Sequence, residues 1–573
     1  MKRLFISAMV SREPVVHTAL LLLLCGALYW PYLGAAPFFN KGEPREAMAV
    51  QDIVLRGEWL VPLKRATDVP SKPPLFHWFA AAAYYLTGDL DEATVRLPSS
   101  LFATLGVLLT YFFARRLFTP EIALLAGAIL ATTILYQDQA LDARVDMTLC
   151  FFVMLSITLF YLLYREILRH WGWYYVFFAV TGIGTLAKGP LGLLLPALVA
   201  GAFLLLKRRV DLVRTFCFHP GVMLMLALAG GWYAIAIIRG GDGFFERQII
   251  GENLHRFAGG SGHSNPVYYY VPYLFAQGLP WAILLPGVLW DSFKRGSSRA
   301  DDHLFIKLWF VVMFAFFSLS LGKRPVYLLP LYPAVAVLTA VWLVNHKAVQ
   351  GARSYYYYGL ALFAAFTGTV LLLIVVGELW NHNPALLFAP VESLLKAKDR
   401  ANFALVNGAL ADFGTPLAFA ALVSSLLWFS LARCFWFQRM LAAALRLVLL
   451  CIVFSFIART LVVPKIAEAK SYRAFMSQVN QLVGPNDTLY LHKSFNSDQV
   501  VFYRGEPVET LTELPSRIIK KGNQTEVYVI ISEREWLKLR KLNVNLPTPF
   551  LKSVATGPEG NAPLVLLRIT QPG

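Results

Sequence analysis

Long apolar runs recur along most of this 573-residue sequence, and each has the length of a membrane-crossing helix. Runs of about 17–22 apolar residues cross a hydrocarbon core of about 30 Å. Charged residues make up only 15% of the chain, against about 25% in a soluble domain, so lipid must cover much of its surface. We therefore predict an α-helical polytopic membrane protein. Its transmembrane helices, about thirteen in number, are expected near residues 15–34, 97–117, 121–137, 147–164, 172–187, 190–206, 220–239, 271–290, 304–320, 325–345, 356–376, 413–432 and 441–462.

Basic residues between the apolar runs give an independent test of this layout, because Lys and Arg concentrate in the cytoplasmic loops of membrane proteins. With a cytoplasmic N-terminus, every second loop carries a basic cluster: Arg115-Arg116, Arg165 with Arg169, Lys207 to Arg209, Lys294-Arg295, Lys347 with Arg353, and Arg433 with Arg439. An odd number of crossings then places the C-terminus outside. These loops also account for the net charge of +17, so membrane lipids are expected partners and nucleic acid is not.

The chain divides into a transmembrane domain, residues 1–462, and a soluble outer domain, residues 463–573. The first outer loop, 35–96, has two stretches with helical spacing of apolar residues, which we expect to lie in the membrane interface. Five cysteines lie in or beside apolar spans, and none falls in the outer domain, so no disulfide framework is expected.

Alternating apolar residues in the outer domain predict a small α/β fold. Strands are expected at 488–492, 499–503, 526–531 and 563–569, and a helix at 471–483. Ser532 and Glu535 form a capping-box pattern that starts another helix. No catalytic motif stands out here, so we interpret the domain as a lid or docking module.

Four basic sites break the charge rule by lying at the outer ends of helices: Lys72, Lys188, Lys323 with Arg324, and Arg256. A single such side chain is explained by snorkelling toward lipid headgroups. Four together favour an outward cavity that holds a phosphate group, because ammonium and guanidinium donors neutralise and hydrogen-bond its oxygens. A ligand with a phosphate beside an apolar tail would need such a cavity.

Acidic candidates cluster at the same ends of the helices: Glu43 and Glu46 in one stretch, Asp142 and Asp146 in another. Ionisable groups at that depth are functional candidates. Carboxylates can stabilise an oxocarbenium-like sugar, or act as a base toward a hydroxyl acceptor. The competing interpretation is internal ion pairing, for instance of Asp146 with Arg144 or of Glu43 with Arg45.

No cofactor follows firmly from the sequence. His255 and Glu252 lie close together in an outer loop and are tentative ligands for a divalent metal such as Zn²⁺ or Mg²⁺. An exposed loop histidine is the competing interpretation. The absence of a Gly-rich phosphate loop from the sequence argues against nucleotide hydrolysis.

Several motifs give the sequence a resemblance to a known family. They are GEPREA (42–47), GEWLVP (57–62), KPPLFHW (72–78), RVDM around Asp146, AKGPLG (187–192), ENLHRF with YYYVPYLFAQGLPW (252–281) and GKRPVYLLPLYPA (322–334). Together they resemble the bacterial lipid-A aminoarabinose transferases, within the type C glycosyltransferases related to protein mannosyltransferases. The resemblance covers roughly residues 15–345.

The resemblance implies a multi-pass enzyme of the bacterial inner membrane that moves a sugar from an undecaprenyl phosphate carrier to lipid A or another periplasmic acceptor. It implies that Lys72 and Arg256, with Lys188 or Lys323, hold the carrier phosphate. Glu43 and Asp146 are then the catalytic candidates. The further substrate-binding candidates are Arg45, Glu46, Asp142, Arg324 and Tyr327.

Two departures from the family pattern bear on the substrate. Gly42 stands where members carry the expected catalytic Asp, and Ser71 stands where the aminoarabinose transferases carry an acidic residue. An acceptor that is itself a phosphate needs little help from a base, whereas a hydroxyl acceptor would require Glu43 to supply it.

Two other functions are also compatible with the sequence. The first is a protein or polysaccharide glycosyltransferase that uses the same carrier. The second is a flippase or transporter for a lipid-linked sugar. Transporters commonly have internal repeats and sites near the bilayer midplane, whereas the polar residues here gather at the outer ends of helices.

Overall fold

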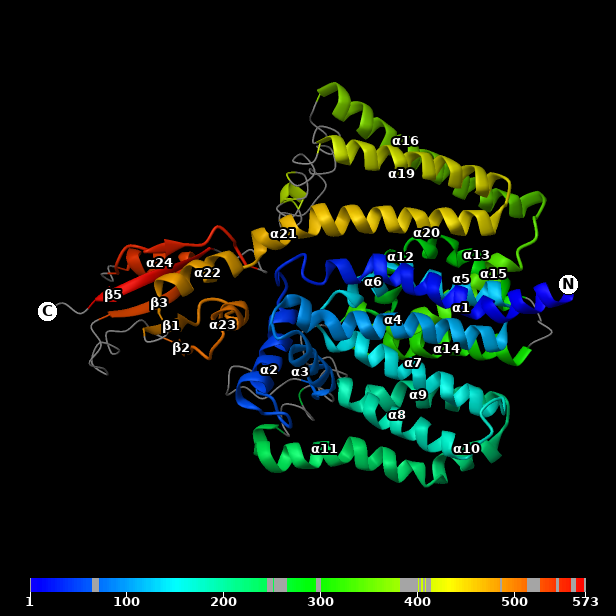
Figure 1. The fold of residues 1–573 in the computed structure, drawn as a ribbon, viewed down its shortest axis with the longest axis horizontal. Coiled ribbons are helices and arrows are strands. Elements are labelled where there is room, and N and C mark those ends of the chain that lie inside the picture. Colours follow the sequence, from blue (N-terminus) through cyan, green and yellow to red (C-terminus); the bar gives the residue numbers. More distant parts are fainter. Residues whose placement is uncertain are drawn as a thin grey trace.

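The computed structural model describes residues 2–63, 72–244, 265–294, 300–381, 414–484, 487–512, 526–542, 546–557 and 563–570, with a few isolated positions between 251 and 408. Most described helices lie side by side along the long axis of the molecule (Figure 1). The β-sheet domain lies beyond one end of this bundle, and the N-terminus lies at the other.

Most helices of the bundle overlap the predicted apolar spans, and α10 (Val210–Phe218) lies between two of those spans. The helices are α1 (Lys2–Leu28), α4 (Glu92–Leu117), α5 (Pro120–Thr132), α6 (Ile134–Ala140), α7 (Val145–Tyr164), α8 (Gly172–Lys188), α9 (Leu191–Leu206), α10 (Val210–Phe218), α11 (Gly221–Phe244), α12 (Tyr270–Gln277), α13 (Leu285–Lys294), α14 (Ala300–Leu319), α15 (Tyr332–Val344), α16 (Ser354–Asn381), α19 (Gly414–Trp436) and α20 (Met440–Ile457). Short 3₁₀ segments, η4 (Trp281–Leu284), η5 (Pro325–Leu331) and η6 (Gly351–Arg353), precede α13, α15 and α16.

The structure confirms a multi-pass membrane protein but not the count of thirteen spans. Within the described residues, nine helices are long and apolar enough to cross a membrane, or eleven if each of two bent helix pairs is one span. The expected span at 121–137 bends by 66° between α5 and α6, and that at 271–290 bends by 113°. The expected spans at 172–187 and 190–206 are helices of 17 and 16 residues, short for a full crossing.

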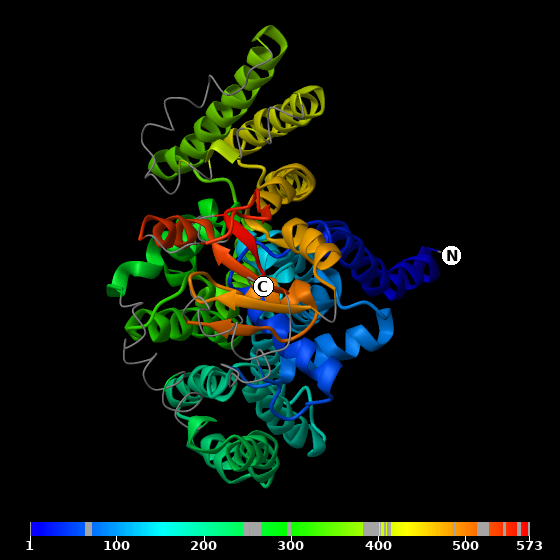
Figure 2. The same ribbon diagram turned by 90° about the vertical axis from the view of Figure 1, so that its left-hand side faces the viewer.

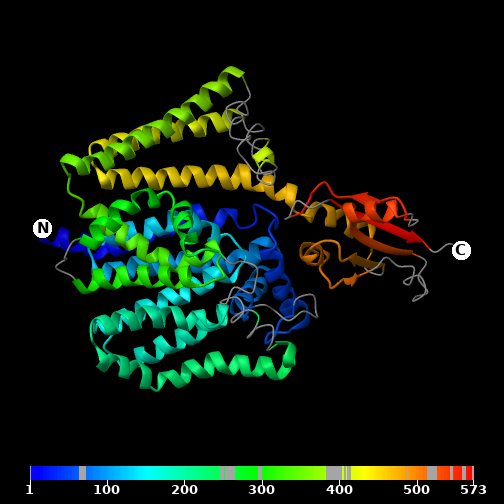
Figure 3. The ribbon, with the colours of Figure 1, turned by 180° about the vertical axis from the view of Figure 1, so that it is seen from behind.

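Burial distinguishes the centre of the bundle from its flanks. The most apolar windows of α7 and of η5 with α15 are 78% and 89% buried, whereas that of α16 is 22% buried. Helices α16 and α19 lie on one flank and α8 to α11 on the opposite flank (Figures 1 and 3). The apolar residues of the flanking helices therefore face outward, as they do where lipid covers a helix.

The loop at 35–96 contains the two predicted helices, α2 (Gly42–Arg56) and α3 (Leu75–Thr87), at the end of the bundle nearest the sheet. Helix α2 starts where the Asn40 side-chain oxygen accepts hydrogen bonds from the N–H groups of Gly42 and Glu43, and it ends at Gly57, whose φ of +68° suits a residue without a Cβ. That these helices lie in the membrane interface stays a prediction.

The C-terminal region forms a five-stranded sheet in the order β2-β1-β3-β5-β4. The strands are β1 (Thr488–His492), β2 (Glu509–Leu511), β3 (Glu526–Ser532), β4 (Leu551–Lys552) and β5 (Leu564–Thr570). The strands β2, β1 and β3 are parallel, and β5 and β4 are antiparallel to their neighbours. The strands predicted at 488–492, 526–531 and 563–569 are confirmed, and β2 and β4 were not predicted.

The helices of this domain are α21 (Val463–Lys470), α22 (Arg473–Leu482), α23 (Asp498–Arg504) and α24 (Glu533–Lys541). The predictions of α22 and of the Ser532 cap are confirmed, because the Ser532 hydroxyl accepts from the N–H of Glu535 at 3.4 Å. The strand predicted at 499–503 is wrong. That segment is α23, whose side chains at 500–502 are buried and which ends at Gly505 with a φ of +86°.

The sheet domain packs through α23 onto helix α2 (Figure 2 shows this end of the molecule). The Tyr503 hydroxyl accepts from the N–H of Phe38 at 3.0 Å and donates to Glu92 Oε1 at 2.7 Å. Phe38 and Phe502 contact edge to face, with ring centroids 5.1 Å apart. Helix α2 is therefore held between the bundle and the sheet domain.

Candidate functional site

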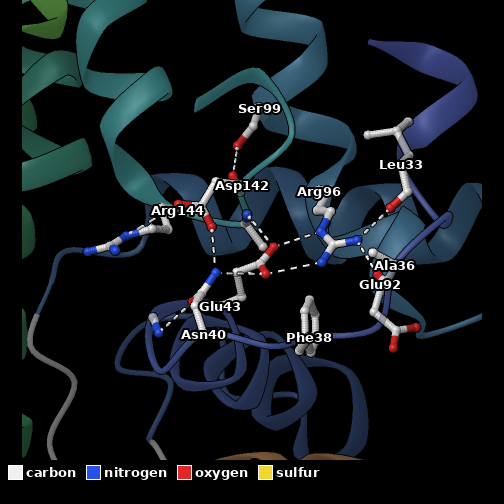
Figure 4. Close-up of polar contacts among 12 residues, drawn as sticks. Leu33, Ala36, Phe38, Asn40, Glu43, Glu92, Arg96, Ser99, Asp142 and Arg144 are labelled. Atoms are coloured by element: carbon white, nitrogen blue, oxygen red, sulfur yellow. Dashed lines mark hydrogen bonds and ion pairs between the residues drawn. The ribbon is translucent and has the colours of Figure 1, made fainter. Parts of the chain in front are cut away.

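Two of the acidic residues singled out in the sequence, Glu43 and Asp142, come together where helix α2 meets the loop between α6 and α7 (Figure 4). The N-terminal turn of α2 supplies Glu43, and the loop supplies Asp142 and Arg144. Although the two segments lie about a hundred positions apart, the Ala143 N–H donates to Glu43 Oε1 at 3.1 Å. This end of the bundle is the one that faces the sheet domain.

Glu43 is fully engaged in a buried ion pair with Arg96, near the start of α4. Arg96 donates from Nε to Glu43 Oε1 at 2.6 Å and from Nη2 to Oε2 at 3.1 Å. Its Nη1 also donates to the carbonyl oxygens of Leu33 and Ala36. With Asn40 Nδ2 at 2.9 Å from Oε2, each Glu43 oxygen has two donors. Glu43 thus pairs with Arg96 and not with Arg45, the partner that the competing interpretation of the sequence named.

Asp142 lies beside Glu43, but its carboxylate accepts longer hydrogen bonds. Asn40 Nδ2 is 3.4 Å from one carboxylate oxygen, and Gln139 Nε2 is 3.5 Å from the other. Burial, and next the negative charge of Glu43, raise the pKa of Asp142 to about 7. Asp142 is thus the carboxyl group at this site whose charge changes near neutral pH.

Arg144 differs from Arg96 because its guanidinium N–H groups are not taken up by hydrogen bonds to the described residues. Its Nε lies 3.6 Å from Asp146 and 4.0 Å from Asp142, too far for hydrogen bonds, and its side chain is 25% exposed. It donates no side-chain hydrogen bond to any residue that the structure describes. The guanidinium extends away from the Glu43–Arg96 pair (Figure 4). Of the two arginines, only Arg144 is free to bind a ligand.

Gly42 allows Arg144 to take this position. A Cβ atom at residue 42 would lie 2.8 Å from Arg144 Nη1 and 3.0 Å from Cζ. The guanidinium therefore occupies the space next to the backbone into which a side chain at residue 42 would project. The structure thus places a cation beside the position where the family resemblance leads one to expect an acid.

Asp146, in the first turn of α7, is the centre of a positively charged cluster. Lys188, the last residue of α8, donates from Nζ to Asp146 Oδ1, and the same Nζ lies 4.7 Å from the centroid of the Tyr327 ring. Lys72 is a further positive charge that acts on Asp146, and it is 8% exposed. With Arg144, three cations share one carboxylate. The ion pair of Asp146 with Arg144, which the competing interpretation of the sequence named, is present at 3.6 Å.

Arg45, Glu46 and His77 form a second polar cluster, between α2 and α3. Arg45 donates from Nη2 to Glu46 Oε1 at 2.7 Å, and His77 Nε2 lies 3.0 Å from Oε2. Burial alone would raise the pKa of Glu46, but the charge of Arg45 and the contact with His77 hold that pKa well below its usual value. Glu46 is therefore an ionised anchor that orients Arg45.

The remaining candidates lie apart or outside the described residues. Lys323 donates from Nζ to the carbonyl oxygens of Asn265 and Ser320. The backbone N–H and carbonyl of Arg324 both bond the Tyr270 hydroxyl at 3.2 Å. Arg256, His255 and Glu252 lie outside the described residues. Among the residues that are described, no group of three or more His, Cys, Asp or Glu side chains is placed to hold a metal ion.

Sequence reasoning missed Arg96, Asn40 and His77. Arg96 carried the same signal as the four exceptional basic sites, since it lies near a helix end that the charge rule predicts to face outward. Asn40 precedes a helix start, where a side chain that accepts backbone N–H bonds is common. His77 belongs to the KPPLFHW motif, but the sequence assigned it no role.

Comparisons with known proteins agree with this architecture. Residues 71–233 match the family model described as dolichyl-phosphate-mannose-protein mannosyltransferase. A protein of Pseudomonas fluorescens named undecaprenyl phosphate-alpha-4-amino-4-deoxy-L-arabinose arabinosyl transferase 2 is 31% identical over 341 residues, 58% of this chain and 57% of that protein. The chain thus spans less than two thirds of the length of the curated relatives it matches.

Solved structures show the same fold. ArnT from Cupriavidus metallidurans, bound to undecaprenyl phosphate, superposes with a TM-score of 0.75 at 21% identity, over 98% of this chain and 99% of that one. The oligosaccharyltransferase of Archaeoglobus fulgidus, tethered with an acceptor peptide, gives a TM-score of 0.52 at 12% identity, over 92% and 70%. The resemblance stated from the motifs is confirmed: in sequence and in fold, this chain is similar to the membrane glycosyltransferases of the aminoarabinose-transferase and protein-mannosyltransferase kind.

Proposed function

We propose that this chain is a membrane glycosyltransferase that moves a sugar from a polyprenyl (undecaprenyl) phosphate carrier to an acceptor on the periplasmic face, closest to aminoarabinose transfer onto lipid A. The observation that carries the proposal is the cluster of Lys72, Arg144 and Lys188 around Asp146. Three basic side chains act on this one carboxylate, and ammonium and guanidinium groups gathered in this way suit the binding of a phosphate, whose oxygens they neutralise and hydrogen-bond.

The chemistry follows from that charge. In transfer, the bond between the sugar C1 and the carrier phosphate oxygen breaks, and its electron pair stays on the phosphate. An acceptor oxygen forms the new bond to C1. Cations already in place stabilise the charge that develops on the leaving phosphate, without reorganisation during the step. Tyr327, beneath Lys188, would hold that ammonium in position.

The roles of the carboxylates differ in this proposal. Asp146 would set the positions of Lys188 and Arg144 and face the cationic sugar. Glu43, whose oxygens are filled by Arg96 and Ala143, would hold the loop in place rather than remove a proton. Asp142, whose pKa burial and the charge of Glu43 raise to about 7, is the carboxyl group that we assign to proton exchange near neutral pH.

Binding of undecaprenyl phosphate to the purified full-length chain tests the proposal. Lys188→Met should weaken binding at least about tenfold, since a charge-assisted hydrogen bond contributes about 1.5–3 kcal/mol. Arg473→Gln is the control, because it removes an exposed cation on the sheet-domain side that pairs with Glu92 and not with Asp146. Equal affinities for wild type and Lys188→Met would refute the proposed phosphate site.

The acceptor is identified by mass spectrometry of lipid A, glycans and exported proteins from cells with and without the protein. Loss of a sugar from lipid A supports the proposed acceptor. Loss from exported protein or polysaccharide supports the alternative acceptors. Unchanged products with a carrier-linked sugar accumulating on the cytoplasmic side would favour a flippase.

We also propose a division into a transmembrane domain, 1–462, and a periplasmic domain, 463–573, in the bacterial inner membrane with a cytoplasmic N-terminus. Its support is the distribution of basic loops. Helix α21 lies at the start of the second domain, between α20 and the sheet (Figure 1).

A further inference from the structure

A cavity of about 290 Å³ lies at the end of the bundle opposite to α2 and α3. It is formed where α13, the last turn of α15 and the start of α16 meet. Its polar and aromatic lining consists of Trp290, Asp291, Trp342, Arg353, Tyr356 and Tyr357. None of these residues belongs to the phosphate cluster around Asp146.

The aromatic side chains form the walls of this cavity. The rings of Trp342 and Tyr357 are nearly parallel, 11° apart in plane, with centroids 6.3 Å apart. The Tyr356 hydroxyl donates to the carbonyl oxygen of Ile283 at 3.0 Å, which fixes that ring. The Trp290 side chain is 58% exposed and carries the Lys294 ammonium 3.9 Å from its ring centroid. Fixed aromatic faces beside an acid suit an ammonium group.

Asp291 supplies that acid. The Trp342 indole N–H donates to its Oδ2 at 2.9 Å, which leaves Oδ1 without a donor from any residue described in the structure. Arg353 lines the same cavity, is exposed, and forms no ion pair with a described carboxylate, Asp291 included. The cavity thus offers one negative and one positive group, each available to a ligand.

The walls are packed in advance rather than formed around a ligand. A Cβ on Gly287 would lie 3.0 Å from Trp342 and 3.1 Å from Tyr356, closer than most Cβ contacts, so a larger residue would push these rings outward by a few tenths of an ångström. On the other side, Val349 is held by Gln438, which accepts from its N–H at 2.8 Å and donates to its carbonyl at 2.9 Å. A preformed pocket binds with less ordering cost than a flexible surface.

We propose that this cavity binds the headgroup of a zwitterionic aminophospholipid of the phosphatidylethanolamine type. The lipid ammonium would donate to Asp291 against the aromatic walls, and its phosphodiester would accept from Arg353. Both signs of charge at one site favour a zwitterion over an anionic lipid. The exposed Trp290 gives acyl chains an apolar route into the bilayer, and tryptophan at a helix end is typical of the headgroup level.

Native mass spectrometry of the purified full-length chain, titrated with phosphatidylethanolamine or phosphatidylglycerol, tests this site. Wild type should prefer phosphatidylethanolamine. Asp291→Asn keeps an oxygen for the Trp342 N–H but removes the charge, and it should weaken phosphatidylethanolamine binding about tenfold while leaving phosphatidylglycerol unchanged. Arg353→Gln should weaken both, and Lys347→Gln, in the same loop, should weaken neither.

Quenching of tryptophan fluorescence by lipids brominated near the headgroup gives a second measurement that does not depend on the transferase reaction. Quenching by brominated phosphatidylethanolamine should fall in Asp291→Asn. Equal affinity of wild type for the two lipids, or an Asp291→Asn variant with unchanged preference, would overturn the proposal.

Discussion

The buried pair of Glu43 and Arg96 yields a prediction that separates a structural carboxylate from a catalytic base. Their side chains are 2% and 4% exposed. In Glu43→Gln, the amide NH₂ must face donors whichever way it is turned, because Arg96 and Ala143 donate to one oxygen and Arg96 and Asn40 to the other. Arg96 also loses its counter-charge. Leaving a buried charge unpaired costs about 3–5 kcal/mol.

We therefore expect Glu43→Gln to lower the free energy of unfolding by about 3 kcal/mol or more. Asp142 reduces the loss, because it ionises more readily once the charge of Glu43 is gone. Denaturant titration in detergent micelles measures the change. The control is Asp211→Asn, which breaks an exposed pair with Arg209 and should cost under about 1 kcal/mol.

Two results bear directly on this reasoning. Replacing the pair together, as Glu43→Leu with Arg96→Met, should recover a large part of the stability, because both charges leave the interior. A Glu43→Gln variant that is as stable as wild type but has lost sugar transfer to a hydroxyl acceptor would refute the structural role and make Glu43 the base.

Three further predictions concern the same end of the molecule and the orientation of the chain. Asp142 keeps its proton in the folded state up to a pKa of about 7, against an ordinary 3.8, so the folded state loses stability as pH rises through that interval. Asp142→Asn should gain thermal stability relative to wild type from pH 4 to pH 8, and a constant difference would contradict this. Gly42→Asp should push Arg144 aside and neutralise it, weakening undecaprenyl phosphate binding more than Gly42→Asn does, whereas equal effects would indicate a steric cause. Cys217 is exposed and the other four cysteines are buried. Because the proposed orientation places Cys217 on the cytoplasmic side, an impermeant thiol reagent should label wild-type protein in spheroplasts only after permeabilisation. The variant Cys217→Ser with Val554→Cys should be labelled in intact spheroplasts, and the reverse pattern would invert the proposed orientation.

The sequence by itself determined the features that depend on neighbours along the chain. Apolar runs of membrane length became helices, since backbone groups in lipid must be satisfied within the segment. Helices α2 and α3 and the cap at Ser532 followed from local periodicity and side-chain chemistry. The motifs carried the family resemblance for the same reason, because each is a short contiguous stretch.

The tertiary structure alone decided which charges meet. Glu43 had Arg45 close in sequence, yet it pairs with Arg96, 53 positions away, because only that guanidinium reaches both carboxylate oxygens inside the bundle. Residues 499–503 are rich in β-branched and aromatic residues, as strands are, but their apolar side chains are buried against α2 as helix α23. In the sequence, Gly42 stands where the family resemblance leads one to expect an acid. In the structure, the absence of a side chain at Gly42 leaves the space that the Arg144 guanidinium occupies. Pairing and packing of this kind depend on distances between segments, which local pattern does not encode.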